Sequence, residues 1–129
     1  MTDKEYEKQK ARVKKFWDKW FVPLGLGWFK VKLVYERVAD DDEPLRITAT
    51  YPHWQYRRAS VYFYLPLCAE HDDERVEDTV VHEMIHILLA GLHNMDDEEK
   101  REITEYTTET LARAVMWARE AGFKEGQKK

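Results

Sequence analysis

Cysteine, glycine and proline are all scarce in this sequence. Its 129 residues include one cysteine, five glycines and four prolines. Cys68 alone cannot form an internal disulfide, and without a Cys-x-x-Cys pair there is neither a zinc ribbon nor a thioredoxin-type site. Few glycines and prolines, with 43% hydrophobic residues, exclude a disordered chain. We therefore expect a folded, cytoplasmic protein in which Cys68 is a small buried hydrophobic residue.

An excess of charge of one sign and a long apolar run are also missing. Lys and Arg number 21 against 25 Asp and Glu, a net charge of −4, so no nucleic-acid partner is expected. The longest apolar stretches, 21–29 and 84–92, are much shorter than the roughly 20 residues that span a membrane. The charged residues 1–17 lack the apolar segment of a signal peptide. We therefore expect no membrane partner. The length predicts one domain, residues 1–129.

Two kinds of hydrophobic pattern predict six elements. Apolar residues recur every three or four positions in three expected helices, 3–20, 73–92 and 98–121. They alternate with polar residues in three expected strands, 29–35, 45–51 and 59–65. Pro52 and Pro66 are expected to end the second and third strands, with His53 and Trp54 in the connecting loop. This order predicts the α+β class.

The second expected helix contains the sequence His-Glu-Met-Ile-His at residues 82–86. On a helix, His82 and His86 lie on one face, about 6 Å apart along the axis, so each can direct one imidazole nitrogen to a single metal ion. Glu83 is offset by one position. It can therefore reach a water on the metal without being a ligand itself.

The surroundings of this motif favour a metal site. Within residues 79–92 the only polar residues are Thr79 and the three motif residues, so we expect the helix to be buried nearly all round. Three ionisable groups there are costly unless each has a partner, and a divalent cation is a partner for all three. A rival interpretation stays open, in which they are hydrogen-bonded core groups or a solvent-facing stripe.

A catalytic zinc site requires a third protein ligand, and the last expected helix offers several carboxylates. Glu105 follows His86 after 18 intervening residues, and Glu109 lies one turn further on the same face. We favour Glu105, with Glu109 and then Glu102 as alternatives. His93 cannot join the two motif histidines, because it lies about 10 Å further along the helix axis.

The packing of the last helix bears on this choice. Its main apolar stripe is expected to point away from Glu105, and consists of Ile103, Thr107, Thr110 and Ala114. Ala112 and Met116 share the face of Glu105, so we expect that second face to be partly covered as well.

The motif and its spacing to Glu105 resemble those of the gluzincin metallopeptidases, specifically the aminopeptidase-type members. The element order over about residues 28–117 resembles the minimal stand-alone members, the minigluzincins. The resemblance implies a zincin-like fold, with an N-terminal helix, a three-stranded sheet, the HExxH helix and a C-terminal glutamate helix. It implies His82, His86 and Glu105 as zinc ligands and Glu83 as general base. Glu109 stands where thermolysin-like members have an Asp that orients the first His, and it is either that support or the ligand itself.

The resemblance also bears on the substrate. It implies that the sheet edge beside the HExxH helix pairs with extended substrate backbone, and residues 59–65 are expected to be that edge. Larger gluzincins stabilise the oxyanion with a His or Tyr from a further domain, and this chain has no His after His93. The residues considered as substitutes are Tyr62, Tyr64, His71 and Arg57.

The sequence therefore predicts a zinc-dependent peptide hydrolase with Glu83 as general base. The expected substrate is a peptide or protein in extended form. Two alternatives stay open: a non-catalytic module in which zinc joins two helices, and a metal-dependent hydrolase of a non-peptide bond. The sequence makes no prediction of the oligomeric state.

Overall fold

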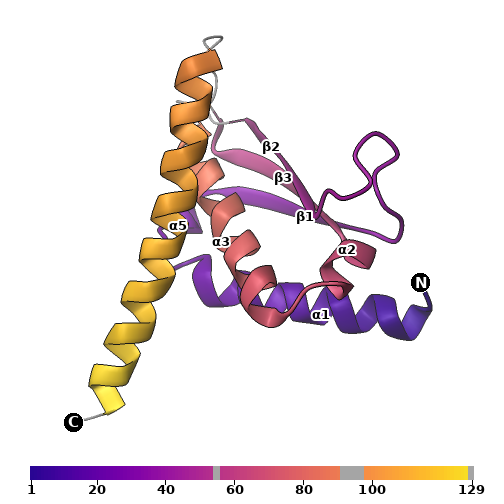
Figure 1. The fold of residues 1–129 in the computed structure, drawn as a ribbon, viewed down its shortest axis with the longest axis horizontal. Coiled ribbons are helices and arrows are strands. Elements are labelled where there is room, and N and C mark those ends of the chain that lie inside the picture. Colours follow the sequence, from indigo (N-terminus) through magenta and orange to yellow (C-terminus); the bar gives the residue numbers. More distant parts are fainter. Residues whose placement is uncertain (54–55, 91–97, 128–129) are drawn as a thin grey trace.

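The computed structural model describes residues 1–53, 56–90 and 98–127 (Figure 1). These residues form four α-helices and one three-stranded sheet, which confirms the predicted α+β class. The helices are α1 (Asp3–Trp20), α2 (Leu65–Ala69), α3 (Asp73–Leu88) and α5 (Glu98–Gln127), and the strands are β1 (Lys30–Glu36), β2 (Thr48–His53) and β3 (Arg58–Tyr64). None of the described helices is long and apolar enough to cross a lipid bilayer.

Side-chain caps define where two of the helices begin. The hydroxyl of Thr2 accepts a hydrogen bond from the backbone N–H of Glu5 (3.1 Å), and the carboxylate of Asp72 accepts one from Arg75 (2.9 Å). α1 covers the predicted range. α3 ends at Leu88, four residues before the predicted end, and residues 91–97 lie outside the described part of the chain.

The three strands are arranged in the order β1-β3-β2. β1 runs parallel to β3 and β2 runs antiparallel to it. β3 is therefore the central strand, and the expectation that residues 59–65 form the edge beside the HExxH helix is wrong. The physical reason is pairing: β3 is hydrogen-bonded to β1 on one side and to β2 on the other, and the alternation of its own side chains does not encode this. The strand beside α3 is β2, and no described strand pairs with its other edge.

Pro52 lies within β2 rather than at its end, contrary to the prediction. The backbone N–H of Tyr64 donates to the carbonyl of Ile47 (2.9 Å), and in an antiparallel pair this fixes which residues face the neighbouring strand. Residue 52 then faces the free edge, where a missing N–H costs no ladder hydrogen bond. His53 accordingly belongs to β2 and not to the loop, and Trp54 lies outside the described residues.

β2 also begins later than predicted, because an organised turn occupies the preceding residues. Asp40 accepts hydrogen bonds from the backbone N–H groups of Asp42 (2.8 Å) and Glu43 (3.4 Å). These bonds hold the pKa of Asp40 below its usual value. Leu45, expected to start the strand, is 84% exposed in this region.

A short helix that the sequence analysis did not predict follows β3. The strand ends at Tyr64, and Pro66 lies in the first turn of α2, where its missing N–H has no intrahelical partner to lose. α2 buries Leu65, Leu67 and Cys68. Burial raises the pKa of the Cys68 thiol to about 11, so it is neutral at physiological pH. This confirms the expected role of Cys68 as a small core residue.

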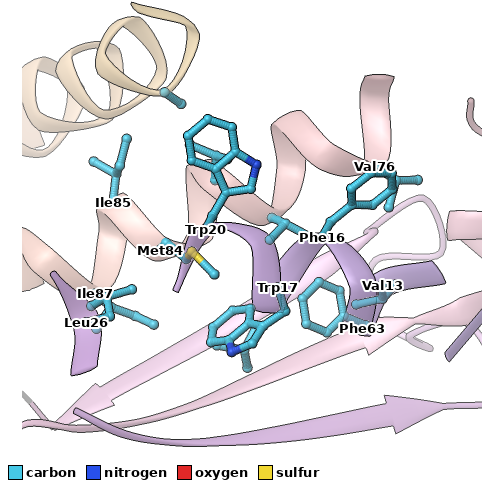
Figure 2. Close-up of a cluster of buried hydrophobic side chains, with 14 of the residues drawn as sticks. Val13, Phe16, Trp17, Trp20, Leu26, Phe63, Val76, Met84, Ile85 and Ile87 are labelled. Carbon is cyan, nitrogen blue, oxygen red and sulfur yellow. The ribbon is translucent and has the colours of Figure 1, made fainter. Parts of the chain in front are cut away.

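The core lies between one face of the sheet and the helices α1 and α3. Figure 2 shows Trp17 of α1 beside Phe63 of β3, with Phe16 of the same helix in the same cluster. The Trp17 ring meets Phe63 edge to face at 6.4 Å between centroids and stacks on Phe21 at 5.7 Å. The contact between Trp17 and Phe63 holds α1 against the sheet.

α5 packs through a different face from the main stripe expected. Its buried residues are Thr104, Thr108 and Ala112, whereas the predicted stripe members Thr107, Thr110 and Ala114 are exposed, and the side chain of Ile103 is outside the described set. The Thr108 hydroxyl donates to the carbonyl of Thr104 (2.8 Å), so the helix itself satisfies it and burial costs little. The second face, through Ala112, is covered as expected. Glu105 lies beside it.

Candidate metal centre

Two histidines on α3 lie one helical turn apart with their rings in edge-to-face contact. The Nε2 atoms of His82 and His86 are 2.9 Å apart, and the ring centroids are 4.6 Å apart. Two neutral ring nitrogens at this distance can share only one proton, whereas both can donate lone pairs to one cation. The pair is therefore arranged as a cation site would require.

α5 adds a carboxylate to the two histidines. One oxygen of Glu105 lies 2.9 Å from Nε2 of His82, and the other lies 3.1 Å from Nε2 of His86. One donor atom from each of the three residues falls within 4.8 Å of the others. The buried Thr104 and Thr108 anchor α5 against the rest of the protein at this level and so position Glu105.

These three residues fit a zinc ion. Four tetrahedral ligands at the usual zinc distances hold neighbouring donor atoms about 3.3 Å apart. The separations between the two Nε2 atoms and the Glu105 oxygens range from 2.9 to 3.3 Å. Two imidazoles and a carboxylate also match the ligand preference of zinc, and three protein ligands leave a fourth position for a water or a substrate.

Glu83 is hydrogen-bonded to β2 through both of its carboxylate oxygens. Its side chain is only 9% exposed. One carboxylate oxygen accepts a hydrogen bond from the hydroxyl of Thr48 (2.7 Å), and the other accepts one from the hydroxyl of Thr50. These threonines were not among the site residues predicted from the sequence. The signal available was a pair of hydroxyl residues two apart in a strand, which places both on one face.

A cavity of about 410 Å³ runs along β2 beside these groups. It is lined by Arg46, Thr48, Ala49, Thr50, Tyr51, Pro52, Glu83 and His86. The cavity thus brings the carboxylate, one histidine of the cluster and the free strand edge together.

Arg46 is the cationic side chain in the lining of this cavity, and the sequence analysis did not consider it. It forms ion pairs with Glu43 (2.6 Å) and with Asp40 (3.5 Å). The hydrogen bond to Glu43 raises the pKa of Arg46. Its guanidinium is therefore held at one end of β2 by two carboxylates.

The other predicted carboxylates do not join the donor cluster. Glu109 is about half exposed and pairs with Arg113 (3.4 Å) one turn along α5. Glu102 is exposed and is not among the residues whose donor atoms converge. His93 lies outside the described residues.

None of the residues considered for the oxyanion lines the cavity. The hydroxyl of Tyr64 donates to the carboxylate of Asp40 (3.2 Å). Desolvation, and to a lesser extent the charge of Asp40, raises the pKa of Tyr64. Tyr62 packs against Tyr51, and the Arg57 guanidinium lies over the Trp28 ring. The carbonyl of His71 accepts a hydrogen bond from Arg12 (2.6 Å).

Comparison with known protein families matches residues 35–102, just over half of the chain, to the SprT-like family. The chain belongs to the SprT-like family. This family consists of minigluzincin-like domains related to metallopeptidases. The SprT-like match covers β2, β3 and the HExxH helix, but it ends before Glu105, so the inclusion of Glu105 rests on the geometry alone. No curated protein and no solved structure matches the chain.

Proposed function

We propose that this SprT-like protein is a zinc-dependent peptide hydrolase of gluzincin type with a zincin-like fold. The observation that carries the proposal is the convergence of His82, His86 and Glu105, together with a cavity along a strand edge that His86 and the buried carboxylate Glu83 line. The three donors are the proposed zinc ligands. A closed structural site would use a fourth protein ligand, and the described residues supply three.

Glu83 is the proposed general base. When bound, zinc supplies Lewis-acid polarisation of a carbonyl and lowers the pKa of a water molecule toward about 7. Glu83 accepts the proton of the attacking water and later delivers it to the leaving amine, so that the carboxylate returns to its starting state. Its low exposure keeps bulk water from competing for that proton.

The proposed substrate is a peptide in extended form, bound along the free edge of β2. The hydrogen bond from Tyr64 to Ile47 directs the backbone groups of residues 47, 49 and 51 toward β3. The N–H and C=O groups of Thr48 and Thr50 then point to the free edge. An added strand would pair with them, and a segment of that strand would lie beside Glu83 and His86.

The test combines metal analysis with peptide cleavage. We expect about one zinc per chain after dialysis without chelator, and cleavage of an unstructured peptide mixture that chelator abolishes. Glu83→Gln should retain zinc and lose cleavage, and His86→Ala should lose both. Glu74→Gln, an exposed carboxylate in the first turn of α3, is the matched control and should behave as the wild type.

The outcomes separate the proposal from its rivals. Zinc bound at one per chain without cleavage of any peptide would favour a module in which the metal joins α3 to α5. Metal-dependent cleavage of a small ester or amide, with peptides left intact, would favour a hydrolase of non-peptide bonds. A protein that binds no zinc at all would contradict the proposal.

A further inference from the structure

The helix-facing side of the sheet changes character at β2. In β3 this side presents Val61 and Phe63, which are buried in the apolar core. The residues opposite them in β2 are Thr50 and Thr48, in that order. Two hydroxyl groups therefore continue an apolar surface at the place where Glu83 of α3 meets the sheet.

These hydroxyls are the partners that hold the Glu83 carboxylate. Each donates to a different oxygen of Glu83, and none of the described partners of Glu83 is a cation. A buried carboxylate loses much of its hydration, so its direction is set by the donors that replace water. Because both oxygens are held, the carboxylate plane is fixed as well as its distance from β2.

The same two residues also present the backbone groups of the free edge. The register of β2 on β3 directs the N–H and C=O of Thr48 and Thr50 away from the sheet. Each residue thus has its main chain on the proposed substrate side and its hydroxyl on Glu83. A substrate strand paired with this edge would be placed relative to Glu83 through two residues alone.

We propose that Thr48 and Thr50 are positioning residues, which fix the Glu83 carboxylate relative to the strand edge where the substrate lies. This inference rests on the proposed function. It predicts that loss of either hydroxyl impairs the chemical step and leaves substrate binding intact, because the backbone groups that pair with substrate are unchanged. Thr→Val removes the hydroxyl at nearly constant shape, and Thr→Ser keeps it.

The first experiment measures kcat and KM of the zinc-loaded protein on a cleaved peptide. Thr48→Val and Thr50→Val should each lower kcat about 10–100-fold and change KM less than about threefold. The serine variants should recover kcat to within about threefold of the wild type. Thr79→Val is the control, since the Thr79 hydroxyl donates to the carbonyl of Arg75 within α3 and should leave kcat unchanged.

The second experiment needs no activity and uses the metal-free protein. Thr50→Val should lower the ratio of folded to unfolded protein at equilibrium. We expect this decrease to be about tenfold larger when Glu83 is present than in the Glu83→Leu background. Thr48→Val should show the same coupling, and Thr79→Val should show none. Urea unfolding of the wild type, the two single variants and the double variant supplies the four values that each comparison requires.

The two experiments distinguish failure of the inference from failure of the proposed function. Wild-type kcat in the valine variants would overturn the positioning role. A serine variant with kcat as low as that of the corresponding valine variant would overturn it as well. If the wild type cleaves nothing, the proposed peptidase function fails and the coupling decides alone. Coupling then supports the two threonines as holders of Glu83, and unfolding effects that do not depend on Glu83 overturn that role.

Discussion

The two long helices that flank α3 pack by opposite means. α1 buries large side chains, which are Val13, Phe16, Trp17 and Trp20. The buried residues in the described part of α5 are the small Thr104, Thr108 and Ala112, while Val115 and Met116 are partly buried against the core. Figure 1 shows α5 running alongside α3 and projecting beyond it, while α1 runs below the sheet in this view. The α1 side of α3 therefore buries the larger apolar side chains, and the candidate metal centre lies on the α5 side.

Polar contacts repeat this difference. Arg12 of α1 donates to Asp73 (2.6 Å), to the carbonyl of Cys68 (2.8 Å) and to that of His71 (2.6 Å), so α1 is joined to the chain before and at the start of α3. The corresponding polar contact of α5 is Glu105 with His82 and His86. One set of contacts is complete within the protein, and the other is completed by a cation under the proposed function.

The largest effect is expected on the α1 side. Trp17→Ala should lower the free energy of unfolding by about 3–5 kcal/mol, because it removes a ring packed on Phe63 and leaves a cavity. Trp117→Ala on α5 is the matched control: its ring is 74% exposed, and the change should stay within about 0.5 kcal/mol. Urea unfolding measures both. Equal losses for the two variants would remove the contrast between the helices.

The next effect concerns zinc affinity at the α5 side. Glu105→Ala should weaken zinc binding more than about 100-fold, or about 2.7 kcal/mol, because it removes a proposed ligand. Glu109→Ala should change it less than about threefold, since Glu109 pairs with Arg113 and lies outside the donor cluster. Titration against a competing chelator at neutral pH gives both constants. A larger loss for Glu109→Ala would reverse the assignment.

A smaller effect tests whether α5 packs closely despite its small side chains. Ala112 is fully buried, so Ala112→Leu should overpack the contact and cost about 1–3 kcal/mol. Ala114→Leu, on the exposed face of the same helix, should cost less than about 0.5 kcal/mol. Thermal unfolding of the metal-free proteins compares them. An Ala112→Leu variant as stable as wild type would mean that this face is not packed.

The smallest effect concerns the ion pair of α1. The hydrogen bond from Arg12 lowers the pKa of Asp73 below its unfolded value of about 3.9. The pair therefore contributes stability that is fully present above about pH 4 and is lost as the pH falls through the lower, folded-state pKa. Asp73→Asn should be less stable than wild type at pH 6 and should converge with it in acid. A constant difference at every pH measured by urea unfolding would sink this assignment.

Local patterns in the sequence predicted the elements more reliably than their arrangement. Apolar spacing placed α1 correctly, since its heavy aromatic side chains have one face to bury. The position of β3 at the centre of the sheet is set by pairing with two strands, which a single strand's alternation does not encode. The predicted start of β2 was wrong, because Asp40 organises a turn through hydrogen bonds to the backbone that compete with the strand.

The candidate site follows the same division. The HExxH spacing brought His82 and His86 into consideration, because a helix fixes which residues share a face. Glu105 lies on another helix, and it was favoured over Glu109 and Glu102 because its spacing from His86 resembles that of the gluzincins. The hydroxyl pair on β2 depends on which strand lies against α3, and this becomes known only with the fold. On α5 the threonines and alanines fit either a buried or an exposed face, so its packing stripe was assigned to the wrong side.

Pro52 limits how far the sheet can grow sideways. Only Thr48 and Thr50 offer both a donor and an acceptor at the free edge of β2, because residue 52 has no N–H to give. Two copies of the protein that met edge to edge would therefore have few backbone groups of β2 to pair. A short extended segment still fits. The free edge of β2 thus suits a short extended segment better than a long strand.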